Sequence, residues 1–242
     1  MDEIVGELKR QGFSMRSGDA MRRWGAVWWR DWERLARSWD TLCRDGHMGD
    51  GGRYRKRRHA VFIVAGGDVR RQPHQPHYQA LQYNPLNGGR SRWFAPVTRE
   101  SAQHPVMAGL LAATASIFEM LEPAGDMPWH VEMHQFRIEA GADFAGLPAP
   151  EGVHRDGVDG VLIMLIGRRN VAGGVTRVYG ADGRMQAELT LAEPGDALFL
   201  DDKTVLHGVT PVTPLDAAVP AVRDALVVTY RRKRREDGNL PG

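Results

Sequence analysis

The sequence predicts a mainly β protein, a sandwich or barrel with flanking helices. Short apolar or alternating segments recur at regular spacing through the second half of the chain, and turn sequences such as Ala181–Gly183 and Glu193–Asp196 separate them. Such spacing is typical of all-β sandwiches and barrels, including the jelly-roll. With 242 residues, the chain can bury a substantial core as a single domain.

The strands are expected in the following order. Trp129–Ile138 comes first, and the unbroken apolar run Val161–Ile166 is typical of a buried strand. Val175–Tyr179 and Met185–Leu191 form a hairpin, because Met185–Leu191 alternates apolar with polar residues and a turn precedes it. The remaining strands are expected at Ala197–Leu200, Val205–Val209 and Ala225–Tyr230.

The first half predicts helices and one strand that support this barrel. Trp24, Val27, Trp28, Leu35, Trp39 and Leu42 recur at helical spacing, with Asp19 as a cap and Gly46 as a stop. A second helix begins at His104-Pro105 and continues through Leu121, because proline suits the first helical position. Between the helices we expect a strand at 60–65 and a loop at 71–89 that lies at the barrel mouth. Residues 1–125 thus supply support elements and mouth loops, 126–232 the jelly-roll core, and 233–242 a disordered basic tail within one domain, 1–242.

Three residues form a candidate metal site. His154 and Asp156 are two positions apart, so on an extended strand their side chains point to the same face. His207, on a later strand of the barrel, supplies a third ligand. Two imidazoles and one carboxylate leave metal positions open, as in non-haem iron oxygenases. From spacing alone, His207 is equally compatible with a core or turn histidine, and His154 with Asp156 with a solvated loop pair.

Several separated motifs resemble the bacterial 2-oxoglutarate/Fe(II) dioxygenase family, which includes the L-isoleucine dioxygenases and related hydroxylases of free amino acids. The resemblance extends from Arg53 to Tyr230, most of the chain. The motifs that carry it are Tyr54–Arg58, Gln79–Gly89, Pro150–Gly157, Arg169–Gly174, Leu206–Pro211 and Arg223-Asp224.

The resemblance implies a double-stranded β-helix (jelly-roll, cupin-like) enzyme with Fe(II) held by His154, Asp156 and His207. The cosubstrates are 2-oxoglutarate and O2, with ascorbate as reductant in vitro, and the products are succinate and CO2. The substrate is a small free L-amino acid that is hydroxylated at an aliphatic C–H bond, or a thioether amino acid that is sulfoxidised. The sequence indicates neither the amino acid, nor the carbon, nor an oligomeric state.

The distal carboxylate of 2-oxoglutarate needs a buried cation, and a guanidinium offers two parallel donors. Arg223 is the first choice because it opens an apolar strand, although it is also compatible with a surface pair with Asp224. Arg231 is the alternative, but with its neighbours it fits a solvated basic tail better. For the substrate, Arg137 is a candidate for the carboxylate or for a pair with Glu139, and Glu151 is a candidate for the ammonium group.

Composition argues against other classes of function. The chain has no apolar run long enough to cross a bilayer, and its acidic N-terminus lacks the features of a secretory signal, so we expect a cytoplasmic protein with no membrane partner. Cys43 is the only cysteine, which excludes an intrachain disulfide. The basic clusters Arg53–Arg58 and Arg231–Arg235 suggest nucleic acid, but a net charge of +2 argues against it. The alternatives are a metal-binding barrel without oxygenase activity, or an oxygenase acting on nucleic acid or on a carrier-bound substrate.

Overall fold

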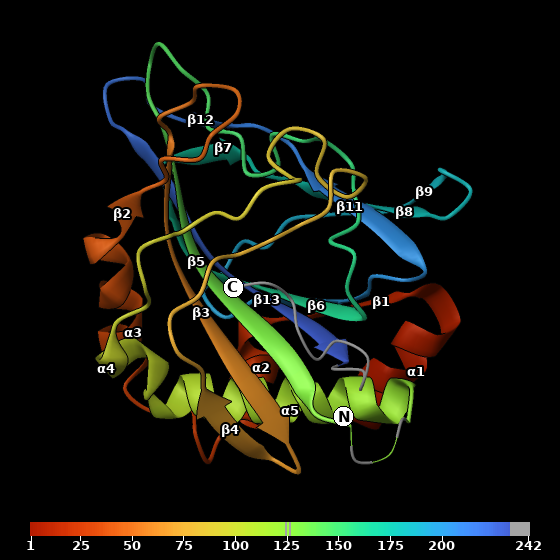
Figure 1. Ribbon diagram of the computed structural model, residues 1–242. Coiled ribbons are helices and arrows are strands. Elements are labelled where there is room, and N and C mark those ends of the chain that lie inside the picture. Colours follow the sequence, from red (N-terminus) through yellow and green to blue (C-terminus); the bar gives the residue numbers. More distant parts are fainter. Residues whose placement is uncertain (124, 126, 233–242) are drawn as a thin grey trace.

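A large antiparallel sheet forms one wall of the molecule (Figure 1). The computed structural model describes residues 1–123, 125 and 127–232. The strands of the sheet follow the order β1-β10-β6-β13-β5-β3-β2, with β4 paired to β3. Their bounds are β1 Phe13–Arg16, β2 Cys43–Arg44, β3 Arg55–Ala65, β4 Asp68–Arg71, β5 Trp129–Ala140, β6 Gly160–Arg169, β10 Ala197–Asp201 and β13 Ala221–Arg232.

Shorter strands form the opposite wall and alternate with the large sheet along the chain. One small sheet has the order β11-β8-β9, and β12 pairs with β7. Their bounds are β7 Val171–Gly173, β8 Thr176–Gly180, β9 Met185–Leu189, β11 Val205–Val209 and β12 Val212–Pro214. From β5 onward the chain passes between the walls repeatedly: β6 and β10 lie in the large sheet, β8, β9 and β11 in the small one, and β13 returns to the large one. This winding is the double-stranded β-helix, or jelly-roll, that the family resemblance implied, and it is a barrel, as the strand spacing predicted.

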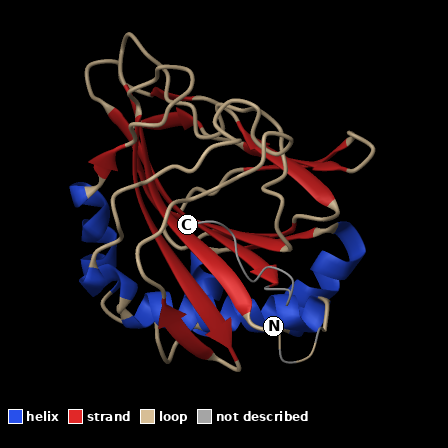
Figure 2. Ribbon diagram, viewed as in Figure 1, coloured by secondary structure: helices blue, strands red, loops and turns tan. Residues whose placement is uncertain are grey.

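The helices cover the outer face of the large sheet (Figure 2). They are α1 Asp2–Gln11, α2 Gly18–Trp24, α3 Trp32–Arg37, the 3-10 helix η1 Ser38–Thr41, α4 Arg99–Ala102 and α5 Pro105–Leu121. The predicted start of α5 is confirmed: the His104 side chain accepts a hydrogen bond from the backbone N–H of Val106, and Pro105 takes the first position. Met107, Leu110 and Leu111 of α5 are fully buried in the core against the sheet.

Strand β5 separates the two environments of the large sheet. Trp129, Val131 and Met133 point to the helix side and belong to its core, whereas the alternate residues His130, Glu132 and His134 line a cavity inside the barrel. Since side chains alternate along a strand, the helix layer and the cavity each receive one set.

The helical stripe expected at 19–46 is interrupted, and its cap is Ser17 rather than Asp19. Helix α2 ends at Trp24, Val27 is exposed, and α3 begins only at Trp32. Between these helices the Trp28 ring packs closely on α5, where a Cβ at Gly109 would lie 2.2 Å from it. Within the described part of the chain, no helix is long and apolar enough to cross a membrane.

Candidate active site

Two backbone hydrogen bonds bring His154 and His207 side by side. The N–H of each residue donates to the carbonyl of the other at 2.9 Å, which adds His154 to the edge of β11. Residues directly opposite in an antiparallel pair share a face, so both imidazoles point to the barrel interior. Their ring centroids are 4.7 Å apart.

Asp156 reaches the same point from a loop held by a buried carboxylate. Asp202 accepts hydrogen bonds from the N–H groups of Asp156 (3.0 Å), Gly157 (2.7 Å) and Val158 (3.0 Å). The Asp156 carboxylate oxygens lie 3.8 Å from Nε2 of His154 and 3.8 Å from Nε2 of His207. The sequence predicted an extended strand through His154 and Asp156. In the structure only His154 pairs with a strand, by a single bridge to His207, and Asp156 lies in a loop.

Gly157 turns the chain directly after Asp156. Its φ is 79°, in the left-handed region, and a Cβ there would lie 2.4 Å from the ring of Tyr83. Tyr83 comes from the expected mouth loop, which also supplies Gln79. The Gln79 amide donates to the Asp156 carbonyl at 3.2 Å and to its carboxylate at 3.4 Å. The mouth loop therefore packs directly on the aspartate.

The donor atoms of the three side chains suit a divalent metal. Nδ1 of His154 lies 2.9 Å from the Gly152 carbonyl, so it carries the proton and Nε2 presents a lone pair. Burial, together with the charge of His154, lowers the pKa of His207 to about 3, which keeps this imidazole neutral. Three donor atoms, one from each side chain, lie within 4.8 Å of one another. Neutral imidazole and carboxylate are the ligands that a non-haem Fe(II) site uses.

The protonation of the other two residues depends on their mutual charge. Burial alone would lower the pKa of His154, but the carboxylates of Asp156 and Glu151 outweigh it and raise the net value. Burial raises the pKa of Asp156, which His154 opposes. A divalent cation between these groups would therefore displace a proton from His154 and stabilise the carboxylate.

Arg223 lies in the same cavity, buried and without a partner. Only 3% of the residue is exposed, and Nε and one terminal nitrogen have no hydrogen-bond acceptor. The stem packs on Gly174, whose missing Cβ would lie 3.3 Å from Cδ of Arg223. Burial and the nearby Arg168 lower the pKa of Arg223 to about 10. A buried guanidinium in this condition requires an anion. The alternative of a surface pair with Asp224 is wrong, since Asp224 binds Arg137.

Arg137 does not reach the cavity. Its guanidinium donates to both carboxylate oxygens of Asp224, at 2.7 and 2.8 Å, and to Asp40 at 2.8 Å. It points to the helix side of β5, as Trp129 and Met133 do. Glu139, the other expected partner, pairs instead with Lys56 at 2.6 Å. The role expected for Arg137, binding a substrate carboxylate, is therefore not available to it in this structure.

The other candidates occupy different places. Glu151 lines the cavity, with one carboxylate oxygen 3.5 Å from Nε2 of His154 and the other buried without a partner. Arg231 also lines the cavity. Arg232, expected in a solvated tail, is buried, and its guanidinium lies 3.7 Å from the centroid of the Trp129 ring. The rest of the predicted tail, 233–242, lies outside the described residues.

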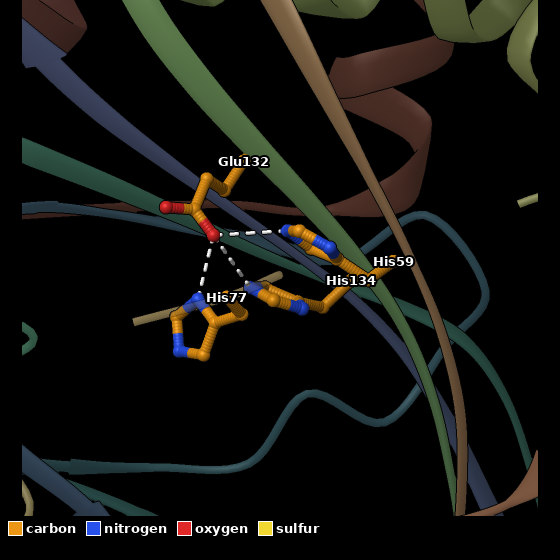
Figure 3. A group of neighbouring side chains, drawn as sticks. All are labelled: His59, His77, Glu132 and His134. Carbon is orange, nitrogen blue, oxygen red and sulfur yellow. Dashed lines mark hydrogen bonds and ion pairs between the residues drawn. The ribbon is translucent and has the colours of Figure 1, made fainter. Parts of the chain in front are cut away.

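A polar wall of the cavity was not predicted. The cavity has a volume of about 390 Å³ and contains the metal candidates, Arg223 and Glu151. Facing it are Arg55, Arg57, His77, Arg92, His130, Glu132 and His134. In Figure 3, His59, His77 and His134 surround the Glu132 carboxylate. The sequence signal was the alternation of His130, Glu132 and His134 at a spacing of two, which places all three on one strand face.

The basic cluster Arg53–Arg58 is not a surface for phosphates. Arg55 and Arg57 alternate inward along β3 and are 5% and 4% exposed. Both lie beside the buried Asp45, with Arg55 at 2.8 Å and Arg57 at 3.6 Å from its carboxylate. The Arg57 guanidinium also lies over the Phe94 ring, 3.5 Å from the centroid. Two of the charges that suggested nucleic acid therefore belong to the cavity.

Comparisons with known proteins agree with this geometry. The model of a family described as 2OG-Fe dioxygenase matches residues 36–229. A BsmA homologue from Methylobium petroleophilum PM1 has a similar crystal structure, with 39% identity, a TM-score of 0.88 and coverage of 96% of this chain and 92% of that chain. IDO from Bacillus thuringiensis shares the fold at 18% identity and a TM-score of 0.77, over 96% of this chain and 99% of that chain. A 3(1)-hydroxy-L-isoleucine 4-dioxygenase from Pantoea ananatis (strain AJ13355) is 24% identical, with 98% of each chain covered.

Proposed function

This chain belongs to the 2OG-Fe dioxygenase family, and from that premise we propose that it hydroxylates an aliphatic C–H bond of a small free L-amino acid. The reaction consumes 2-oxoglutarate and O2 and releases succinate and CO2. A thioether amino acid would be sulfoxidised at the same centre. The observation that carries the proposal is a three-ligand metal site and an unpartnered arginine within one cavity.

His154, Asp156 and His207 are the proposed Fe(II) ligands. The lone pair on Nε2 of His154, the neutral imidazole of His207 and the Asp156 carboxylate fit this ion, as described above. When bound, Fe(II) with its cosubstrates supplies the oxidising chemistry, which side chains alone cannot perform. The protein contributes position: Asp202 holds the loop of Asp156, and the bridge to β11 fixes the distance between the two imidazoles.

Arg223 is the proposed partner of the distal carboxylate of 2-oxoglutarate. Arg223 lines the cavity and two of its nitrogens lack an acceptor, so a carboxylate there would accept two parallel hydrogen bonds from the guanidinium. Binding would also compensate a charge that is buried without an acid beside it. Arg231 lines the cavity too, but it is less buried than Arg223.

The size of the cavity and one relative support an amino acid as substrate. About 390 Å³ holds a keto acid and one further small molecule, and leaves little room for a polymer. The relative from Pantoea ananatis is named for a hydroxylated isoleucine. A free amino acid therefore fits better than a nucleic acid.

Succinate formation tests the proposal. The purified protein is supplied with Fe(II), ascorbate and 2-oxoglutarate, alone and with each free L-amino acid in turn, beside His207→Ala and His47→Ala. His47 lies outside the cavity and serves as the matched control. We expect a class of amino acids to stimulate succinate formation in wild type and in His47→Ala, and not in His207→Ala. Stimulation that persists in His207→Ala would refute the assignment.

A further inference from the structure

Glu132 is a half-buried carboxylate whose close partners are all histidines. One oxygen accepts hydrogen bonds from Nε2 of His59 at 2.9 Å and from Nδ1 of His77 at 2.6 Å (Figure 3). The other oxygen has only Nε2 of His130, at 3.4 Å. Among the described residues, no lysine or arginine lies within ion-pair distance of Glu132. The cavity thus holds a fixed anion with an oxygen that can accept a further donor.

The histidines around Glu132 hold it by hydrogen bonds, and burial works against a positive charge on three of them. It lowers the pKa of His59, His77 and His134. The pKa of Glu132 lies well below its usual range: burial opposes this, but the charge of His77 and the histidine hydrogen bonds outweigh it. A carboxylate that faces a cavity with no lysine or arginine paired to it, among the described residues, attracts a cation.

The hydrogen bond between Arg57 and His134 argues against a metal as that cation. Arg57 donates to Nδ1 of His134 at 2.7 Å, so a neutral His134 carries its proton on Nε2, the nitrogen nearer Glu132. A protonated nitrogen cannot bind a metal. The 2.6 and 2.9 Å separations at Glu132 are also hydrogen-bond lengths. The geometry therefore favours a cation that donates hydrogen bonds, as an ammonium group does.

Arg92 supplies the opposite charge within the same cavity. Arg92 and His77 exchange backbone hydrogen bonds at 2.9 and 3.0 Å, so their side chains share a face and both line the cavity. Only 2% of Arg92 is exposed, yet within the described chain its guanidinium has no hydrogen bond or ion pair, and its Nε is buried. Burial and the neighbouring Arg55 lower its pKa to about 10. Arg92 therefore lacks an anion, as Arg223 does.

We propose that Glu132 and Arg92 bind the charged groups of an α-amino acid, Glu132 accepting hydrogen bonds from the ammonium group and Arg92 donating to the carboxylate. This inference rests on the function proposed above and names the residues that recognise its substrate class. Both side chains neighbour His77: Glu132 accepts a hydrogen bond from its ring, and Arg92 is directly opposite it in the backbone bridge. An N-acylated amino acid has no charged amine and would leave Glu132 without its partner. An amino acid bound to a carrier through its carboxyl group would leave Arg92 without one.

The amino acid site is separate from the site proposed for the keto acid. Glu132 lies opposite Thr229 across β5 and β13. Arg223 is at the start of β13, roughly 20 Å along the strand from Thr229 at about 3.3 Å per residue. In this proposal Arg92 binds the carboxylate of the amino acid, and Arg223 that of the keto acid. Glu132 is also near enough for its charge to raise the pKa of Asp156, which places the amino acid beside the metal ligands.

The test removes the charged groups of the substrate and the proposed side chains one at a time, and asks which removals have the same effect. The twenty common L-amino acids are screened for stimulation of succinate formation. The strongest stimulator is then compared with its des-amino, N-acetyl and amide forms in wild type, Glu132→Gln and Arg92→Met. Glu139→Gln and Arg90→Met are the controls, because Glu139 and the exposed Arg90 do not line the cavity. Thermal unfolding of each variant checks its fold.

The proposal predicts a loss matched to one group of the substrate. Glu132→Gln lowers kcat/KM for the free amino acid by roughly 10- to 100-fold and abolishes its preference over the des-amino form, since one charged hydrogen bond is lost. Arg92→Met abolishes the preference for the free acid over its amide in the same way. Both controls keep the wild-type preferences.

Other results would overturn the inference. The first is that Glu132→Gln and Arg92→Met keep the wild-type preferences. The second is that Glu151→Gln, and not Glu132→Gln, loses the preference for the free amine. The third is that an N-acetyl amino acid is the best substrate. A second equivalent of bound metal that Glu132→Gln removes would assign the cluster to a cation of another kind. Failure of the proposed function looks different: the wild type then forms no succinate with any of these compounds.

Discussion

Replacing Arg223 with methionine should raise the stability of the ligand-free protein while weakening its binding of 2-oxoglutarate. Arg223 is charged at neutral pH in the folded and the unfolded chain, and its burial without an acid lowers its pKa from 12.5 to about 10. That difference corresponds to a cost of about 3 kcal/mol. Methionine keeps most of the apolar stem without the charge, so the variant should unfold several degrees higher, at about 2–4 °C per kcal/mol for a chain of this size.

The same change removes the proposed partner of the distal carboxylate. Charged hydrogen bonds contribute about 1.5–3 kcal/mol each, so the Kd for 2-oxoglutarate should rise by at least about tenfold. Calorimetric titration of the Mn(II)-loaded protein measures the Kd, and thermal unfolding without ligand measures stability.

Arg168→Met is the matched control. Arg168 lies opposite Arg223 on β6 and donates to the carbonyls of Leu191, Val171 and Gly173 at 3.3, 2.9 and 3.1 Å. Because Arg168 has partners to lose, its removal should destabilise the protein. A variant Arg223→Met that unfolds at a lower temperature and binds 2-oxoglutarate as the wild type does would refute the reasoning.

Three further predictions concern the metal site and its support. The affinity for Co(II), a probe for Fe(II), should fall as the pH decreases, because the raised pKa of His154 lets protons compete for it while His207 stays neutral. A pH-independent Kd between pH 6 and 8 would contradict this. Asp202→Asn should weaken Co(II) binding about 10- to 100-fold by loosening the loop of Asp156, and unchanged binding would show that the loop holds without the carboxylate. Arg137→Met should destabilise the protein by about 3–5 kcal/mol, because it leaves Asp224 buried and unpaired. Chemical denaturation measures the free energy of unfolding. Unaltered stability together with a changed KM for the substrate would instead show that Arg137 binds the substrate.

The sequence was sufficient to predict the jelly-roll and to bring three distant residues together. Strand spacing predicts the barrel, and a spacing of two predicts that His154 and Asp156 share a face. What the pattern did not contain was the turn after Asp156, which depends on the left-handed Gly157 and on Tyr83 from the mouth loop. It also did not indicate Asp202, whose role arises only when the loop folds over it.

The two faces of β5 show why the role of Arg137 was misjudged. Arg137 lies on the same face as Trp129 and Met133, and a charge among apolar residues suggested a ligand. The large sheet, however, packs its apolar face on helices and turns the alternate face, with Glu132 and His134, to the cavity. Arg137 is accommodated in the helix layer by Asp224, directly opposite on β13. Alternation reveals two faces, but only the packing of the helices decides which one faces the ligand.

The central claim is that His154, Asp156 and His207 hold the Fe(II) at which 2-oxoglutarate and an amino acid react. The most direct test is the yield of succinate when anaerobic protein, loaded with one equivalent of Fe(II) and with 2-oxoglutarate and the strongest amino acid stimulator, is exposed to O2. The account predicts about one succinate per chain in the first turnover of wild type and none above the protein-free background in Asp156→Ala. Equal succinate yields from the two proteins would contradict it.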